Sequence, residues 1–381
     1  MAESTARKTG EADWQAAAES LAARFGERAA AHDEGDRFVR DNIEALKAAG
    51  LSAAGVPAEF GGWGLGPVEL GAMLRILGRA CGSTALAFSM HTHQVATAAW
   101  RWRREGAPME GLLRRVAAER LILVSSGGSD WLAGSARAER VEGGFRVDGR
   151  KIFASGVPAG DLLMTTAVLE EPGAAPTVLH VTIPLGAPGV SVLDTWQTMG
   201  MRGTGSHDVE LRGVFVPDAA VGVRRPSGVW HPLMHTVSMV AFPLVYSAYL
   251  GVAEAAREAA LSLAAQRRAA GHLAALAGEM DTHLTGARLA VDHMLRLAAG
   301  ADPGPETTNA VFQGRTLAAR GMLAAVDRAM ELAGGAGFYR SRGLERLFRD
   351  IQGARYHPLG EKIQAEYAGH LALGLDASRI G

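Results

Sequence analysis

Apolar residues recur at helical spacing in the first part of the chain. One set lies three or four positions apart and predicts the buried face of a helix: Trp14, Ala18, Leu21 and Phe25. A second set repeats this step before Gly50, where glycine can end a helix: Val39, Ile43 and Leu46. Helical patterns return after Pro226 and continue through the carboxy terminus, with a Pro/Gly-containing loop predicted over 301–308. Both ends of the chain are therefore predicted to be helical.

The periodicity changes at Leu121, where a short apolar run is followed by alternating residues around Gly143-Gly144. Two glycines between alternating segments are typical of a β-hairpin. Further strands are predicted over three segments: 162–169, 177–183 and 209–216. Long helical patterns do not separate these strands, so a parallel dinucleotide-binding sheet is disfavoured. A small antiparallel barrel fits the pattern better.

These patterns predict a mostly helical α+β protein with three domains. The expected divisions are an N-terminal helical domain over 1–118, a β-barrel domain over 119–226 and a four-helix bundle over 227–381. The chain has 381 residues and 48% hydrophobic content, which is enough for a large core. The most apolar run, 237–253, is shorter than a comfortable membrane span of about 20 residues, so it is interpreted as a buried bundle helix.

Charge and cysteine content exclude several classes of function. Lys and Arg number 39 against 40 Asp and Glu, so the basic excess expected of a nucleic-acid-binding protein is missing. A single cysteine, Cys81, excludes an intrachain disulfide framework and a multi-cysteine metal site. The polar start of the sequence has no apolar signal core. A cytoplasmic protein that binds neither nucleic acid nor membrane is predicted.

The segment 89–93 contains two histidines, His91 and His93, at a spacing that invites a metal-site interpretation. Residues two apart on a helix point to nearly opposite sides, so both imidazoles cannot reach one ion. No metal site is predicted. Taken alone, the segment favours a hydrogen-bonded core or surface histidine, and the functional alternative is that one of the two histidines lines a ligand pocket.

The segment 331–362 combines a helix end, a glycine turn and a short charged helix. The glycines Gly334, Gly335 and Gly337 carry no Cβ, so a phosphate or another backbone can approach closely, although a simple helix stop has the same pattern. The pairs Glu345-Arg346 and Arg349-Asp350 follow these glycines. In this order the motifs resemble those of the acyl-CoA dehydrogenase family. The resemblance implies that the three glycines hold the dinucleotide part of FAD from a neighbouring subunit, in a homodimer or homotetramer.

Two motifs in the predicted barrel resemble flavin-contacting segments of the same family. Residues 124–130 (VSSGGSD) resemble TEPxxGSD without the Glu-Pro pair, which implies that Ser125, Ser126 and Ser129 contact the pyrimidine side of the flavin. Residues 151–156 (KIFASG) resemble KxWITNG, which implies that Phe153 covers the flavin and that Ser155 faces N5. A donor at N5 stabilises the reduced flavin as hydride arrives. An ordinary strand with a turn serine is the competing interpretation.

The resemblance covers nearly the whole chain. Residues 51–66 (LSAAGVPAEFGGWGLG) resemble a family signature at a helix end, and 266–271 (QRRAAG) resemble RxxFG, whose arginine pairs with the FAD pyrophosphate. Arg267 is the implied phosphate-binding residue, and Arg268 takes this role if the register shifts by one. The implied cofactor is FAD, with FMN as the alternative.

The sequence departs from the family at both positions that usually hold a catalytic glutamate, which are occupied by Pro358 and Ala241. Three functions are therefore considered. The main one is an acyl-CoA dehydrogenase-like oxidoreductase that acts on an acyl thioester or related small molecule by hydride transfer to flavin N5. The alternatives are a reduced-flavin, O2-dependent monooxygenase on the same fold and a non-catalytic flavin- or acyl-binding subunit. An electron-transfer or flavin-reductase partner would supply or remove electrons.

The polar groups expected near the flavin are His357, Ser155 and His91. His357 precedes Pro358, which restricts it to extended geometry and limits the directions of its imidazole. An imidazole with an ordinary pKa near about 6.5 can accept a proton at neutral pH, which suits abstraction of an α-proton. His357 is therefore the predicted catalytic residue, and a histidine that merely closes the helix is the alternative.

Overall fold

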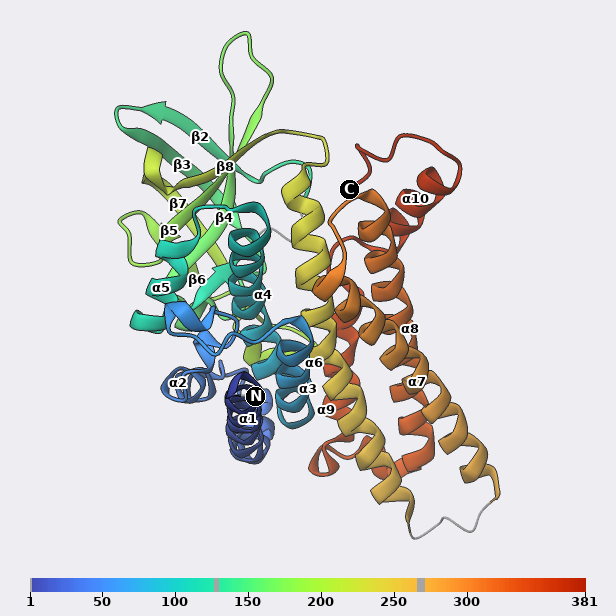
Figure 1. Cartoon of the computed structure of the whole chain (residues 1–381). Helices are drawn as coiled ribbons and strands as arrows, with labels where there is room; N and C mark the ends of the chain where they lie inside the picture. The colour runs from blue at the N-terminus through green and yellow to red at the C-terminus, as the bar shows by residue number, and fades with distance from the viewer. Residues whose placement is uncertain (1, 127–129, 266–270) are drawn as a thin grey trace.

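The computed structural model describes residues 2–126, 130–265 and 271–381, with side chains from Trp14 onward (Figure 1). The first part of the chain is helical, as predicted, with five α-helices: α1 (Ala2–Glu34), α2 (Arg40–Ala48), α3 (Pro67–Ala80), α4 (Gly82–Glu105) and α5 (Glu110–Glu119). The apolar positions that predicted α1 and α2 are buried in the core: Trp14, Ala18, Leu21, Phe25, Val39, Ile43 and Leu46.

The middle part forms one twisted sheet of eight strands in the order β6-β7-β3-β2-β4-β5-β8, with β1 paired to β4. The strands are β1 (Leu123–Ser125), β2 (Ala136–Val141), β3 (Gly144–Lys151), β4 (Leu162–Leu169), β5 (Thr177–Pro184), β6 (Val190–Leu193), β7 (Asp208–Pro217) and β8 (Val221–Pro226). Alternate residues of these strands, such as Leu163 and Val181, form a second core inside the curved sheet. The predicted strands at 162–169, 177–183 and 209–216 are confirmed within one residue at each end.

Two details of the sheet differ from the prediction. β1 and β2 both pair with β4 in parallel, so the sheet is mixed and not purely antiparallel. The hairpin turn consists of Glu142 and Gly143, one residue earlier than the Gly143-Gly144 signal, because Val141 pairs with Gly144. Gly143 has a φ of 75°, the left-handed conformation that such a turn favours.

The last part contains three long helices, α6 (Pro232–Ala264), α7 (Gly271–Gly300) and α8 (Pro305–Ala333), which pack against one another. The expected fourth long helix is replaced by two short ones, α9 (Leu344–Ile351) and α10 (Glu361–Ala372). Among the described residues, α6 is the one helix long and apolar enough to cross a membrane, but 94% of its most apolar window is buried inside the protein. It is the core helix that the sequence predicted over 237–253.

Two glycines allow an N-terminal helix, α3, to pack closely against a C-terminal helix, α6. A Cβ placed on Gly78 of α3 would lie 2.3 Å from the carbonyl oxygen of Ala248 in α6, and one on Gly251 of α6 would lie 2.3 Å from the carbonyl oxygen of Arg75. A side chain at either position would clash with backbone, so α3 and α6 can approach this closely only because both residues are glycine. The two helices therefore belong to one continuous core.

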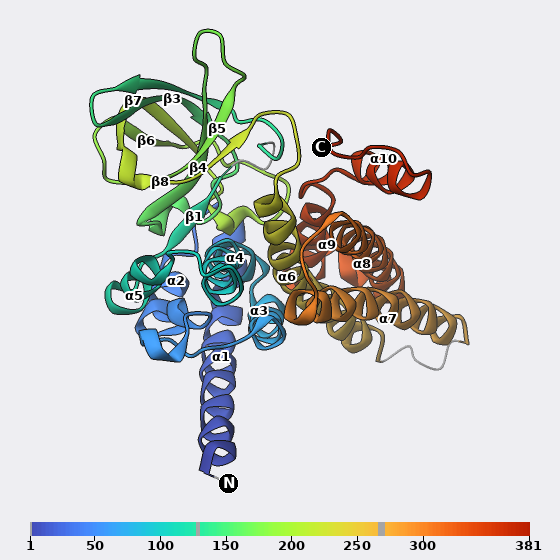
Figure 2. The same cartoon turned by 45° about the horizontal axis from the view of Figure 1, so that its top comes forward.

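The fold class is confirmed as mostly helical α+β, with a β-sheet unit between two helical ones. The sheet lies on one side of α4, and α6, α7 and α8 lie on the other (Figure 2). The domain divisions at 118 and 226 stay predictions; α5 ends at Glu119 and β8 ends at Pro226.

Candidate active site

A cavity of about 1250 Å³ lies where the sheet, α4, α6 and the segment after α9 meet. Ligand pockets usually enclose roughly 300–1,000 Å³, so this one has room for more than one small molecule. Five of the predicted site residues line it: Ser125, Ser126, Phe153, Ser155 and His357. Segments separated by more than 200 positions in the sequence are thus brought to one place.

Ser155 ends a chain of three hydroxyl groups. The Ser206 hydroxyl donates to Ser155 Oγ at 2.7 Å, and Ser206 Oγ lies 2.7 Å from Thr204 Oγ1. Ser206 and Thr204 are buried. Because Ser155 Oγ accepts from Ser206, its own O–H is free to donate into the cavity. The hydroxyl is therefore held in place from behind and offers one donor in front.

Phe153 presents an aromatic surface to the same part of the cavity. Its side chain is 55% exposed, and its ring stands edge-on to Trp196 with centroids 6.0 Å apart. The residue has a φ of 56°, in the left-handed region that few residues other than glycine adopt. An exposed aromatic ring beside a free hydroxyl donor matches a planar, hydrogen-bonding heterocycle. These residues fit a flavin ring.

Ser125, the last residue of β1, and Ser126, which follows it, continue the polar wall. Ser126 Oγ lies 2.7 Å from Thr165 Oγ1, and Ser125 Oγ lies 3.3 Å from Nε2 of His93 on α4. Burial lowers the pKa of His93 to about 4, so this imidazole is neutral at physiological pH. Ser129, the third serine of the motif, lies outside the described residues.

His91 does not line the cavity, so its predicted place at the flavin is wrong. Its side chain is 1% exposed, and both ring nitrogens have backbone partners: Nε2 donates to Ser52 O at 2.7 Å, and Nδ1 accepts from Leu123 N at 3.0 Å. Burial lowers its pKa to about 4. His91 therefore fixes β1 against α4, and His93, on the other side of the helix, is the histidine that lines the pocket.

His357 lies in the cavity wall after α9 but is poorly suited to be a base. Its Nε2 is hydrogen-bonded to the Tyr249 hydroxyl at 2.8 Å, and Arg315 donates to its backbone oxygen at 2.6 Å. Burial and the nearby Arg315 charge lower the pKa of His357 to about 3. Tyr249 was missed by the sequence reasoning because it lies within the most apolar run of the chain, where only helical phase distinguishes a cavity residue from a core residue.

Free carboxylates are lacking in this wall. Both positions that hold a glutamate in the resembled enzymes, Ala241 and Pro358, line the cavity. Among the described lining residues the one carboxylate is Asp130, whose Oδ2 accepts from Lys151 Nζ at 2.6 Å. Asp130 is 5% exposed and Lys151 is fully buried. This carboxylate is thus committed to a buried ion pair.

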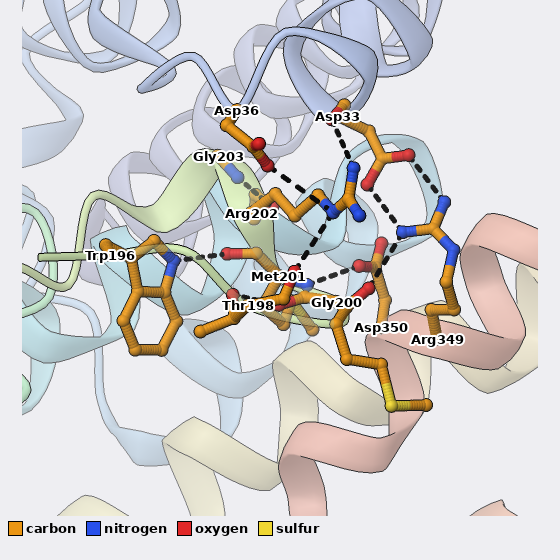
Figure 3. A network of polar contacts seen from close by, with 12 residues as sticks. Asp33, Asp36, Trp196, Thr198, Gly200, Met201, Arg202, Gly203, Arg349 and Asp350 are labelled. Atoms are coloured by element: carbon orange, nitrogen blue, oxygen red, sulfur yellow. Dashed lines mark hydrogen bonds and ion pairs between the residues drawn. The ribbon is translucent and has the colours of Figure 1, made fainter.

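A polar network that shares Arg349, Met199 and Met201 with the cavity wall positions the segment 196–204, which carries Trp196 (Figure 3). Asp350 accepts the backbone N–H of Met201 at 2.5 Å, and burial raises the pKa of Asp350 to about 6. Arg349 binds both carboxylate oxygens of Asp33, at 2.5 and 2.9 Å, and the backbone oxygen of Met199 at 2.9 Å. The predicted Arg-Asp pair thus connects all three parts of the chain at the cavity wall.

The glycine turn is remote from the cavity within one chain. Gly334 follows the last residue of α8, and neither it nor Gly335 and Gly337 lines the pocket. A Cβ on Gly335 would meet nothing within 4 Å, so its surroundings are open, whereas Gly337 packs against Leu344. Contact of these glycines with a neighbouring subunit's cofactor stays a prediction. Arg267 and Arg268 lie outside the described residues.

Family models match most of the chain: the N-terminal domain of acyl-CoA dehydrogenases at residues 10–106, the middle domain at 125–214 and the C-terminal domain at 239–357. An amino sugar nitrososynthase, DnmZ of Streptomyces peucetius, is 31% identical over 360 residues, which are 87% of this chain and 86% of that protein. The chain therefore belongs to the acyl-CoA dehydrogenase family. It is a flavin-dependent oxidoreductase of that superfamily.

Two further relatives are a protein named for acyl-CoA dehydrogenation and a structure solved with FMN and a sugar nucleotide. The provisionally named acyl-CoA dehydrogenase YdbM of Bacillus subtilis is 27% identical over 367 residues, 91% of this chain and 92% of that protein. The solved structure of KijD3 with FMN and dTDP-3-amino-2,3,6-trideoxy-4-keto-3-methyl-D-glucose is 26% identical with a TM-score of 0.87, and the match covers 96% of this chain and 94% of that one. The relatives thus include proteins named for different reactions, an amino sugar nitrososynthase and an acyl-CoA dehydrogenase.

Proposed function

We propose that this protein is a reduced-flavin, O2-dependent monooxygenase that oxidises an amine nitrogen of a small molecule. The observation that carries the proposal is the composition of the cavity wall at Ala241 and Pro358, where a dehydrogenase needs a carboxylate. The nearby imidazole of His357, with a pKa of about 3, is too weak a base to replace it. Similarity to an amino sugar nitrososynthase supports the amine as substrate.

The bound flavin would supply two electrons and activate O2. Overall, one amine, one O2, two electrons and two protons give one hydroxylamine and one water, and a separate flavin reductase using a reduced nicotinamide supplies the electrons. Ser125, Ser126, Phe153 and Ser155 would hold the ring, with the Ser155 hydroxyl as a donor to it. FMN is favoured over FAD because the KijD3 structure contains FMN.

The residues around the proposed reaction site favour the unprotonated form of a bound amine. An amine nitrogen reacts through its lone pair, which is free only in the unprotonated form. The described part of the cavity has no unpaired carboxylate to stabilise an ammonium ion, and both His93 and His357 are neutral. Tyr249 holds Nε2 of His357 in a hydrogen bond, so Nδ1 is the ring nitrogen left for a ligand. The dehydrogenase reaction gains nothing from these features.

Product analysis tests the proposal. Protein loaded with FMN or FAD is supplied with a flavin reductase, reduced nicotinamide, 18O2 and a panel of primary amines, including amino sugars. The expected product is a hydroxylamine or a more oxidised nitrogen compound that carries 18O. Anaerobic reduction of the bound flavin by an acyl thioester, without any nitrogen oxidation, would overturn the proposal in favour of a dehydrogenase. Flavin binding without either reaction would indicate that the protein is a non-catalytic subunit.

Assembly of several copies is also part of the proposal. Two large aromatic side chains follow the glycine turn and face solvent, Phe338 at 83% and Tyr339 at 67% exposure. Exposed aromatic residues next to a turn with open surroundings at Gly335 are suited to contact between copies. This supports the homodimer or homotetramer that the sequence predicted, with the glycine turn at the interface.

A further inference from the structure

One face of α4 continues the cavity away from the flavin end. His93, Thr97 and Arg101 are four residues apart, so they share that face, and all three line the cavity. At 1.5 Å per residue, Arg101 lies about 12 Å along the helix from His93. The Thr97 hydroxyl, between them, is buried and has no hydrogen-bond partner in the described part of the chain. The cavity is thus an elongated space with polar groups along one wall.

The opposite wall at the far end carries His180 of β5, whose proton position is fixed by its neighbour. Arg225 of β8 donates from Nε to Nε2 of His180 at 2.9 Å. A guanidinium has only donors, so His180 Nε2 must be the acceptor, and the neutral ring then carries its proton on Nδ1. Over the described ranges, no acceptor is found for Nδ1. His180 lines the cavity, so this N–H is available to a ligand.

The positive charge of Arg225, which lies behind His180, is not fully balanced by negative charge. The Arg225 residue is 1% exposed, and its two terminal nitrogens each donate one hydrogen bond, Nη1 to the backbone oxygen of Leu132 at 2.6 Å and Nη2 to that of Asp130 at 3.1 Å. The Asp130 carboxylate is bound by Lys151 at 2.6 Å. One carboxylate therefore faces two cations, and the cluster keeps one net positive charge.

Other groups that face His180 add to this character. His231 and Arg101 both lower the pKa of His180, which burial and Arg225 bring to about 3, while Asp130 raises it. Arg101 donates from Nε to Glu105 at 2.9 Å, which leaves its terminal N–H groups for a ligand. A buried, uncompensated cation is unfavourable until an anion or strong acceptor comes near.

We propose that this far end is an anion subsite, in which His180 Nδ1–H and Arg101 bind a phosphate or carboxylate of the substrate with Arg225 as the buried charge behind them. The substrate is then an elongated molecule whose anionic group lies about 12 Å from its reacting end near His93. That the reacting end is an amine rests on the proposed function. Thr97 would bond to a polar group in the middle of the molecule.

Calorimetry on the flavin-loaded protein tests the subsite without turnover. Inorganic pyrophosphate and glutarate are titrated separately, so that phosphate and carboxylate recognition are distinguished. Binding of either is expected for the parent protein. His180→Leu removes the donor and should weaken the binding about tenfold or more, the usual effect of a charge-assisted hydrogen bond. Arg101→Gln should weaken it by a similar factor.

Two variants make the test specific to His180. His180→Gln can accept from Arg225 through its carbonyl and donate to the ligand through its amide, so it should retain most of the affinity that His180→Leu loses. Thr182→Val, at the next outward position of β5 and also in the cavity wall, is the matched control and should bind like the parent. Thermal unfolding of each variant verifies that the fold is intact.

The subsite is overturned if neither anion binds the parent protein, or if binding is the same in His180→Leu, Arg101→Gln and the parent. These outcomes are separate from the fate of the proposed function. Anion binding at His180 with no 18O in any amine product would remove the monooxygenase and keep the subsite. Amine oxidation that does not discriminate between neutral and anionic amines would support the monooxygenase and remove the subsite.

Discussion

The hydroxyl of Tyr249 lies 2.8 Å from Nε2 of His357, so a residue of α6 holds this imidazole in its orientation. Burial raises the pKa of Tyr249 well above its ordinary value, so the phenol stays protonated. His357 was predicted to be the catalytic base, and a buried imidazole with Nε2 already hydrogen-bonded is better suited to binding a ligand.

Tyr249→Phe tests this relationship. Removing the hydroxyl frees the His357 ring to rotate, so we expect at least a fivefold decrease in nitrogen product formed per reduced nicotinamide consumed, with flavin affinity unchanged. Product yield is measured by mass spectrometry. Tyr246→Phe is the matched control, because its hydroxyl donates to Ala354 O and does not line the cavity. Equal yields in both variants would contradict a role for the Tyr249 hydroxyl.

The hydroxyl chain behind Ser155 predicts graded effects on flavin binding. Ser155→Ala removes the donor and should weaken flavin binding about five- to tenfold, since a hydrogen bond contributes about 1 kcal/mol. Ser206→Ala leaves Ser155 unsupported and should have a smaller effect in the same direction. Fluorescence titration with FMN and FAD measures both. Ser155→Thr keeps the hydroxyl and should bind like the parent; a loss equal to that of Ser155→Ala would exclude the hydroxyl as the cause.

Arg349 should be important for stability. Its guanidinium bonds to Asp33 and to Glu345, and all three side chains are largely buried. Arg349→Gln leaves two carboxylates without their partner, so we expect a loss of about 3 kcal/mol in the free energy of unfolding. Urea denaturation gives this value. Arg320→Gln breaks an exposed pair with Glu361 and should lose less than about 1 kcal/mol. Similar losses in the two variants would count against the network.

Acid should destabilise the protein between pH 6.5 and 4. His91 and His93 have folded pKa values of about 4 against 6.5 for an ordinary histidine, so in this window the unfolded chain binds more protons. Each of the two histidines should therefore lower the free energy of unfolding of the protein by about 2 kcal/mol between pH 6.5 and 5. Asp350 has the opposite effect. Its folded pKa of about 6 is above the ordinary 3.8, so its contribution to the stability of the protein increases as the pH falls below 6. The two histidines outweigh it.

His91→Gln isolates one part of this pH dependence. Glutamine can donate to Ser52 O and accept from Leu123 N but does not titrate, so the difference in unfolding free energy between pH 7 and 5 should decrease by about 2 kcal/mol. Urea denaturation at the two pH values measures it. His272→Gln, at an exposed position, should leave the difference unchanged. An unchanged difference in His91→Gln would mean that His91 is not buried in its neutral form.

The aromatic pair after the glycine turn predicts the oligomeric state. Phe338→Arg places a charge where an apolar contact between copies is proposed, so it should shift the protein to a smaller species and weaken flavin binding at the same time. Light scattering and flavin titration measure the two effects. Val68→Arg, at another exposed apolar residue, is the control. A monomeric parent protein with full flavin occupancy would refute the shared site.

Local patterns predicted the elements well and the site in part. The strands at 162–169 and 177–183 could be placed because short apolar runs bounded by Pro- and Gly-containing turns are local signals. Which of His91 and His93 lines the cavity depends on which face of α4 is turned toward the cavity. The sequence does not show where the sheet lies relative to that helix. Tyr249 and Arg225 looked like ordinary core and strand residues, because their partners lie 108 and 45 positions away. Motif order placed Phe153, Ser155 and His357 at one cavity, which periodicity alone could not.

The contact between Asp33 and Arg349 spans 316 positions in the sequence. A ribosome adds roughly 5–20 residues per second, so about 16–60 s separate the synthesis of these two residues. Throughout that interval the nascent N-terminal helices lack the arginine that will bind Asp33, and Met201, once synthesised, lacks its carboxylate partner for a further 149 residues. The cofactor pocket is therefore completed only near the end of translation, and a chain that stops before Arg349 would leave the ribosome unable to form it.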